Sequence, residues 1–132
     1  MKNVLRFLGI ITITAVIGLS FTACGGVAHK DFIGTWEYEY DGQRNIDQNR
    51  TITSKYLITS FAKYRIVNAT PVLNTVDATR ENYPSGFRFD TEVVESNSST
   101  FPIGNRGNFI YYMHIGKREM VDHSTYWHFV KQ

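Results

Sequence analysis

The sequence of 132 residues contains a single cysteine, Cys24, and only three prolines. One thiol cannot form an intrachain disulfide or a multi-cysteine metal site, which excludes both as supports for the fold. Zinc-binding His-Glu motifs, nucleophile elbows and phosphate-binding glycine loops are also missing. The sequence therefore predicts neither an enzyme nor a protein with a cofactor.

The chain also lacks a strong excess of positive or negative charge. The chain carries 14 basic and 12 acidic side chains, and two of the basic ones, Lys2 and Arg6, precede the only long apolar run. Without these two residues the signs balance at 12 each. A balanced chain gives no argument for nucleic acid as a partner, nor for attraction to a membrane by net charge.

The apolar run is "FLGIITITAVIGLSF", residues 7–21. A positive start followed by a run of this length is typical of a secretory signal, whereas a transmembrane helix needs roughly 20 apolar residues. The small residues Thr22 and Ala23 come next, directly before Cys24. We therefore predict a signal peptide over residues 1–23, with cleavage before Cys24.

This junction resembles the lipobox of bacterial lipoproteins, in which small residues precede an obligatory cysteine. The resemblance implies that the sulfur of Cys24 is lipidated and that the new amino terminus is acylated. Several acyl chains anchor a protein stably, since each buried methylene contributes about 0.8 kcal/mol. The alternative is a free thiol in an ordinary exported protein. Residues 24–30, which end in "GGVAHK", then form a lipidated flexible tether.

The resemblance also implies a location in the bacterial cell envelope, facing the periplasm or the cell surface. Gly25 follows Cys24, where some inner-membrane lipoproteins have an aspartate, so the outer membrane is preferred. Removal of the leader leaves 109 residues, a length that suits one domain with one core. We expect that domain at residues 31–132.

The rest of the chain has the patterns of β-strands. "TWEYEY", residues 35–40, alternates aromatic with other side chains, and Asp41–Gly42 favours a turn. Residues 109–115 show little alternation, which indicates a strand covered on both sides. A break is expected at residues 69–71, a helical turn capped by Asp77 at 77–82, and a type II′ turn at 116–117. About eight short strands at spacings of roughly 8–12 residues predict an all-β sandwich or up-and-down barrel.

Gly34-Thr35-Trp36 resembles the glycine-x-tryptophan signature of lipocalins and related calycins. In that family the tryptophan closes one end of a small antiparallel up-and-down eight-stranded barrel, and a basic side chain near the chain's end packs over it. The resemblance implies that Gly34 and Trp36 are structural and that Lys131 or Arg118 covers the indole. A cation over an indole contributes about 0.5–2 kcal/mol.

The part after the leader carries 17 aromatic residues. An eight-stranded barrel either fills its interior with side chains or holds one small ligand among them. We expect a small hydrophobic ligand, held by inward-facing rings. Alternation assigns to this wall Tyr38, Tyr40, Tyr56, Phe87, Phe89, Tyr111 and Trp127. The alternative, in which these rings fill the core, stays open.

With a filled core, the chain would instead be a surface or periplasmic protein-binding lipoprotein, such as an adhesin or a lysozyme inhibitor. Lysozyme inhibitors of this size present a loop that contains Ser-Gly, and "YPSGF", residues 83–87, resembles it. The polar loop at residues 96–108 offers Phe101, Ile103 and Arg106 as contacts for a protein partner.

The imidazoles outside the predicted tether belong to His114, His123 and His128. His123 and His128 are five residues apart, which places them on opposite faces of a continuous strand. His114 and His128, on adjoining strands, are the remaining candidates for metal ligands. We predict neither a metal site nor catalysis from these residues.

Overall fold

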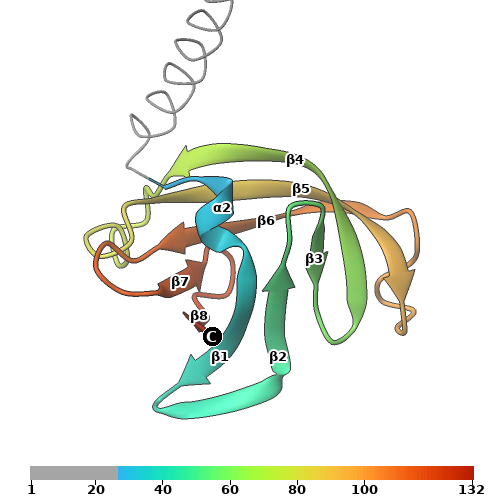
Figure 1. The fold of residues 1–132 in the computed structure, drawn as a ribbon, viewed down its shortest axis with the longest axis horizontal. Helices are drawn as coiled ribbons and strands as arrows, with labels where there is room; N and C mark the ends of the chain where they lie inside the picture. The colour runs from blue at the N-terminus through green and yellow to red at the C-terminus, as the bar shows by residue number, and fades with distance from the viewer. Residues whose placement is uncertain (1–26) are drawn as a thin grey trace, which may run out of the picture.

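The structure, a computed structural model, describes residues 27–132 (Figure 1). Cys24 and the predicted signal peptide lie outside the described residues. One short helix, α2 (His29–Phe32), precedes eight strands. These are β1 (Gly34–Tyr40), β2 (Gln43–Ile52), β3 (Tyr56–Ile58), β4 (Ala62–Leu73), β5 (Ser85–Ser96), β6 (Arg106–Met113), β7 (Glu119–Asp122) and β8 (His128–Lys131). No helix within this range is long and apolar enough to cross a bilayer.

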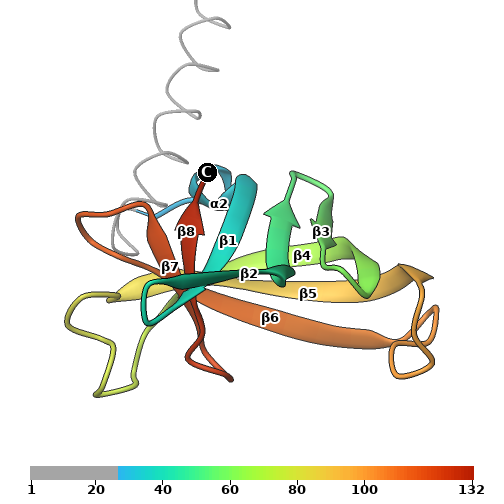
Figure 2. The same cartoon turned by 90° about the horizontal axis from the view of Figure 1, so that it is seen from below.

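The strands form a closed antiparallel barrel in chain order, and β8 completes it by pairing with β1 (Figure 2). The prediction of an eight-stranded up-and-down barrel is confirmed. Its connections alternate between two ends. The α2 end carries α2, the connections β2–β3, β4–β5 and β6–β7, and the C-terminus, while the hairpin end carries the other four connections. Figure 1 shows α2 above and the β1–β2 hairpin below.

The core lies inside the barrel because inward and outward side chains alternate along the strands. In β5, for example, Phe87 and Phe89 are buried on either side of the exposed Arg88. Helix α2 covers the α2 end with Phe32, whose ring lies 5.8 Å from both of these phenyl rings. Burial of one such side chain contributes about 1.5–3 kcal/mol.

A second, smaller cluster lies outside the barrel wall. Tyr111 and Tyr112 are neighbours in β6 and both are buried, which confirms that this strand is covered on both sides. Tyr111 belongs to the core, whereas Tyr112 packs with Tyr83 and Val121. The β4–β5 connection, which carries Tyr83, therefore covers the outer face of β6.

Strand β4 differs from the prediction because it runs through residues 69–71, where we expected a break. It pairs with β5 along its length but with β3 only at Lys63–Arg65. Pro71 thus lies where β4 has one strand neighbour, a place that tolerates a residue without an N–H group.

The turns predicted at residues 77–82 and 116–117 differ from the prediction in detail. Residues 77–82 do form a turn with helix-type hydrogen bonds, since the Arg80 N–H donates to the Val76 carbonyl oxygen at 2.9 Å. The capping residue is Asn74 rather than Asp77, because the Asn74 Oδ1 accepts the Val76 N–H at 2.9 Å. Gly116 lacks the positive φ that a type II′ turn requires. Instead, the ring nitrogen Nδ1 of His114 lies 2.9 Å from the Gly116 amide and 3.1 Å from the Lys117 amide, and it accepts both N–H groups.

The first described residues also contact the core. Val27 packs against the core, and the ring of His29 lies 5.1 Å from that of Phe89. Val27 and His29 therefore help to cover the α2 end, whereas Lys30 is exposed. Residues 27–132 form a closed eight-stranded barrel around its own core, as expected of one domain.

Candidate functional site

The α2 end is closed by Trp36, which is fully buried. Its Nε1–H donates to the carbonyl oxygen of Phe32 at 2.8 Å and so ties β1 to α2. The Nζ of Lys131 lies 5.6 Å from the centroid of the indole. Gly34 has a φ of 147°, and a Cβ at this position would lie 2.9 Å from Lys131 Cε. The glycine thus supplies both the backbone conformation and the room for the lysine.

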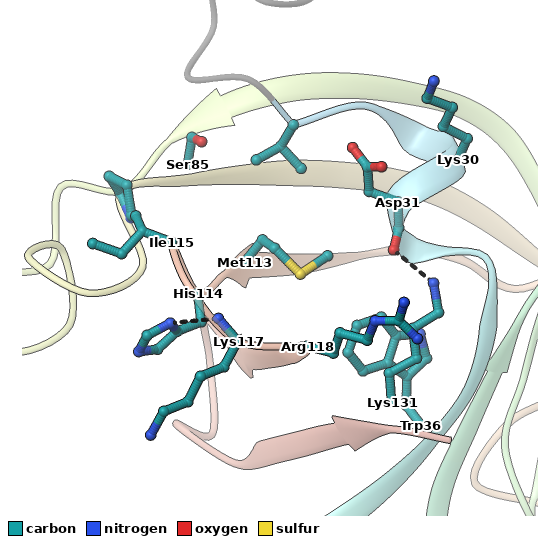
Figure 3. A pocket seen from close by; sticks show the side chains of 12 residues that line it. Lys30, Asp31, Trp36, Ser85, Met113, His114, Ile115, Lys117, Arg118 and Lys131 are labelled. Atoms are coloured by element: carbon teal, nitrogen blue, oxygen red, sulfur yellow. Dashed lines mark hydrogen bonds between the residues drawn. The ribbon is translucent and has the colours of Figure 1, made fainter.

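Of the two basic residues predicted to cover the indole, Lys131 makes the contact. The Arg118 carbonyl accepts the Lys131 backbone N–H at 2.9 Å, and both side chains line the same pocket (Figure 3). Lys131 therefore covers the indole, and Arg118 fixes the backbone of Lys131.

A pocket of about 530 Å³ opens beside this closure; we call it the α2-end pocket (Figure 3). It lies between α2, the start of β5 and the β6–β7 connection. Four cationic side chains and one acidic side chain line it, namely Lys30, Lys117, Arg118, Lys131 and Asp31. Nothing in the sequence patterns predicted this gathering, because the four cations are spread over 102 positions.

Five of the seven rings predicted to line the interior are part of the core or pack against it. Phe87, Phe89 and Tyr111 are fully buried. Tyr38 and Trp127 are half-buried against the cluster, with their ring centroids 5.0 Å apart. The rings contact one another, as Phe87 and Phe89 do at 6.1 Å. Side chains therefore fill much of the barrel at the α2 end.

The other two rings point outward, and the prediction for them is wrong. Tyr40 is 73% exposed, because β1 extends beyond its pairing with β8, which stops at Glu39. Tyr56 precedes Leu57, which is fully buried, so the alternation of β3 turns the tyrosine outward. Lys63 Nζ lies 4.3 Å from the Tyr56 ring centroid.

At the hairpin end a cavity of about 190 Å³ enters the barrel wall; we call it the mouth cavity. It forms where β6 continues beyond its pairing with β7, which stops at Tyr111 and Asp122. The lining consists of Arg50 and the two segments 108–110 and 122–125. Phe109 and Ile110 make part of this surface apolar.

Arg50 is an unusual inward residue of this cavity. It pairs with Trp36 across β1 and β2, so both side chains lie on the inner face of the sheet. Its guanidinium carbon lies 5.4 Å from the centroid of Phe129, and its Nη1 donates to the carbonyl oxygen of Gln48 at 2.9 Å. Its Nε is buried without a hydrogen-bond partner. Within residues 27–132, no carboxylate forms an ion pair with Arg50.

Two polar neighbours of the half-buried Arg50, Tyr111 and Asp122, are themselves buried. The Tyr111 hydroxyl has no hydrogen-bond partner. Burial raises the pKa of Tyr111, and Arg50 opposes this shift both by its charge and by the proximity of its side chain to the Tyr111 hydroxyl. The charge of Arg50 also opposes the raised pKa of Tyr64. The Asp122 carboxylate accepts the backbone N–H and the hydroxyl of Ser124, both at 2.8 Å, so its own turn satisfies it. Among residues 27–132 Arg50 therefore has carbonyl oxygens and the Tyr111 hydroxyl as polar neighbours but no carboxylate partner.

The predicted Ser-Gly loop is not a loop. Ser85 and Gly86 are the first residues of β5, and both are buried. A side chain at Gly86 would collide with the backbone of Tyr111. The prediction that residues 83–87 present an inhibitor-like contact is therefore wrong, because β6 packs directly against them.

The loop at residues 96–108 is exposed in part. Phe101 is half-buried and its ring centroid lies 6.2 Å from that of Phe61. Ile103 is 71% exposed, and Arg106 is exposed at the start of β6. Ile103 and Arg106 thus remain accessible to a partner.

The three histidines contact tyrosines. The rings of His114 and His128 lie 5.0 and 5.7 Å from that of Tyr83, and His123 Nδ1 lies 2.9 Å from the Tyr112 hydroxyl oxygen. Burial, together with the Glu119 carboxylate, raises the pKa of Tyr83 to about 12. Among residues 27–132, no three His, Cys, Asp or Glu side chains are grouped so that they could hold a metal.

Comparison of the chain with models of known protein families, with curated proteins and with solved structures gave no match. A proposal about function must therefore rest on the geometry of the barrel and its two ends.

Proposed function

We propose that the chain is a lipid-anchored, exported binding protein of the bacterial cell envelope that holds a small apolar ligand with an acidic group. The observation that carries this proposal is Arg50, an inward cation with a buried, unpartnered Nε and no carboxylate partner within the described residues. An eight-stranded barrel fits a binding protein of this kind.

The energetics favour an anionic group beside Arg50. A buried donor without a partner costs about 1–3 kcal/mol, and more when it is charged. A ligand carboxylate that accepts the Nε–H would remove this cost and form a charge-assisted hydrogen bond. Phe109 and Ile110 would then contact the apolar part of the ligand.

The size of the mouth cavity limits the ligand. Its volume of about 190 Å³ is below the roughly 300–1,000 Å³ of sites for drug-sized molecules. A short-chain or single-ring carboxylic acid fits this limit, whereas a long fatty acid would need the space that the core side chains occupy.

The binding proposal is tested by calorimetric titration with hexanoate and with hexanol, its neutral counterpart. We expect saturable binding of hexanoate and little binding of hexanol. Arg50→Gln should weaken hexanoate binding roughly 10-fold or more, the loss expected for a hydrogen bond to a charged group. Arg44→Gln, an exposed arginine on the same strand, is the control and should bind as the parent does.

Equal binding of hexanoate and hexanol, or an Arg50→Gln variant with undiminished affinity, would contradict the role of Arg50. Absence of saturable binding for short aliphatic and aromatic acids alike would contradict the ligand proposal altogether.

The lipid anchor has its own test. Expression of the full chain in a bacterium with radiolabelled palmitate should give a labelled band and a membrane-bound product. Cys24→Ser should abolish the label, because no thiol remains to accept a diacylglycerol group. A variant that keeps its label would show that the lipid is attached elsewhere.

A second candidate function is protein binding at the hairpin end. Five large apolar side chains are exposed there, namely Tyr40, Ile46, Phe61, Ile103 and Tyr126. Exposed aromatic and aliphatic groups of this kind are typical anchors of an interface. Ile46→Ser with Ile103→Ser separates the two functions, because it would weaken capture of a protein partner and leave hexanoate binding unchanged.

A further inference from the structure

The α2 end carries a group of positive side chains that do not line the mouth cavity. Lys30 comes from α2, Lys117 and Arg118 from the β6–β7 connection, and Lys131 from β8. Asp31 is the one acidic side chain that lines the same pocket. None of the four cations is in an ion pair with a described carboxylate. Like charges held together in this way favour an anionic partner.

Exposed apolar side chains lie at the same end. Leu73 is 67% exposed and Ile115 is 68% exposed. Ile115 lines the α2-end pocket, and Leu73 pairs with Ser85, which lines it as well. Cations beside exposed aliphatic groups suit a bilayer surface, since the cations meet lipid phosphates and the aliphatic groups enter the interface.

The α2-end pocket also contains a polar group without a partner. The Ser85 hydroxyl is buried and makes no hydrogen bond. Figure 3 shows Ser85 at the back of the pocket, while Lys30 and Lys117 extend outward from two sides. The two outward cations could contact anionic groups on a flat surface. The Ser85 hydroxyl could donate a hydrogen bond to an oxygen of a group that enters the pocket from that surface.

The predicted anchor brings this end close to a bilayer. Val27 lines the pocket, and Cys24 precedes it by three residues, which span at most about 11 Å. This step rests on the proposed lipid anchor, whereas the charge and the exposed aliphatic groups do not.

We propose that the α2 end docks on an anionic membrane surface. The phosphates of anionic phospholipids contact Lys30, Lys117 and Arg118, and Leu73 and Ile115 enter the interface. The phosphate of one headgroup occupies the α2-end pocket. The barrel then stands on the bilayer with its mouth cavity directed away from the membrane.

The test uses residues 24–132 with Cys24→Ser, because a lipidated chain would bind any vesicle through its acyl chains. This part contains the whole barrel. We expect it to sediment with vesicles that contain phosphatidylglycerol and not with pure phosphatidylcholine vesicles. Lys117→Gln with Arg118→Gln should weaken binding roughly 25-fold, or about fivefold for each cation. Ile115→Ser should weaken it further.

The matched control is Arg44→Gln with Arg65→Gln, which removes the same charge from exposed positions on β2 and β4. It should bind vesicles as the parent does, and circular dichroism should show that all variants are folded. The proposal is overturned if both vesicle types bind equally, if neither binds, or if the control weakens binding as much as the test pair. Complete displacement by inorganic phosphate, at an ionic strength matched with chloride, would indicate a site for free anions and also overturn it.

The two proposals fail separately. Lys117→Gln with Arg118→Gln should leave hexanoate binding unchanged, because the two sites lie at opposite ends of the barrel. A domain that binds hexanoate but no vesicle would overturn only the docking, and the reverse result would overturn only the ligand.

Discussion

Gly86→Ala is expected to destabilise the domain by more than about 3 kcal/mol, the upper part of the range for overpacking in a core. A Cβ at this position would lie 1.8 Å from the Tyr111 carbonyl oxygen and 2.7 Å from Tyr112 Cα. Both contacts are with backbone, so neither strand can yield without loss of the β5–β6 ladder. Since small domains are stable by about 5–15 kcal/mol, this is a large share of the total.

Urea unfolding followed by circular dichroism measures the effect. Gly107→Ala is the matched control, because Gly107 also lies in this strand pair but has no heavy atom near its added Cβ. The control should cost less than about 1 kcal/mol, as exposed surface substitutions do. If the two variants are equally stable, the close approach of β5 and β6 at Gly86 is contradicted.

Trp36→Ala should cost about 3–5 kcal/mol, the range for removal of a large buried aromatic side chain. The indole is fully buried. Its loss also leaves the Phe32 carbonyl oxygen without a hydrogen-bond donor and removes the cation–π partner of Lys131. Helix α2 should therefore loosen from the barrel before the rest of the domain unfolds.

The measurement is again urea unfolding, combined with hydrogen exchange of the α2 amides. Trp127→Ala is the control for loss of an indole, since Trp127 is only half-buried, and it should cost clearly less. Lys131→Met removes the charge while keeping the aliphatic stem, and it should cost about 0.5–2 kcal/mol. A Trp36→Ala domain as stable as the Trp127→Ala domain would show that Trp36 does not close the barrel.

The sequence predicted the strands best where one face meets water and the other meets the core. Residues 35–40 and β5 alternate clearly, so both were found. The first half of β2 was missed, because residues 43–49 are half-buried or exposed and show no apolar period. The continuation of β4 through Pro71 was missed as well. A proline is tolerated there because β3 does not pair with this part of β4, and strand pairing cannot be read from the neighbouring residues in the sequence.

The site was less predictable than the fold. Arginine in a polar stretch is normally assigned to the surface, and the inward position of Arg50 follows only from its pairing with Trp36. The separation of two between Arg50 and the buried Ile52 was the one local signal available. The balanced charge likewise concealed the cations of the α2 end, because balance over a chain says nothing about where folding gathers its charges.

The single neighbour of β4 beyond Arg65 has a consequence for self-association. Within the described residues, one side of this segment pairs with no strand, and bare edges of this kind recruit strands from other molecules into fibrils. Pro71 has no amide hydrogen to offer an incoming chain, so a continuous intermolecular ladder cannot grow past it. We therefore expect Pro71 to oppose edge-to-edge association between copies of this barrel at high concentration.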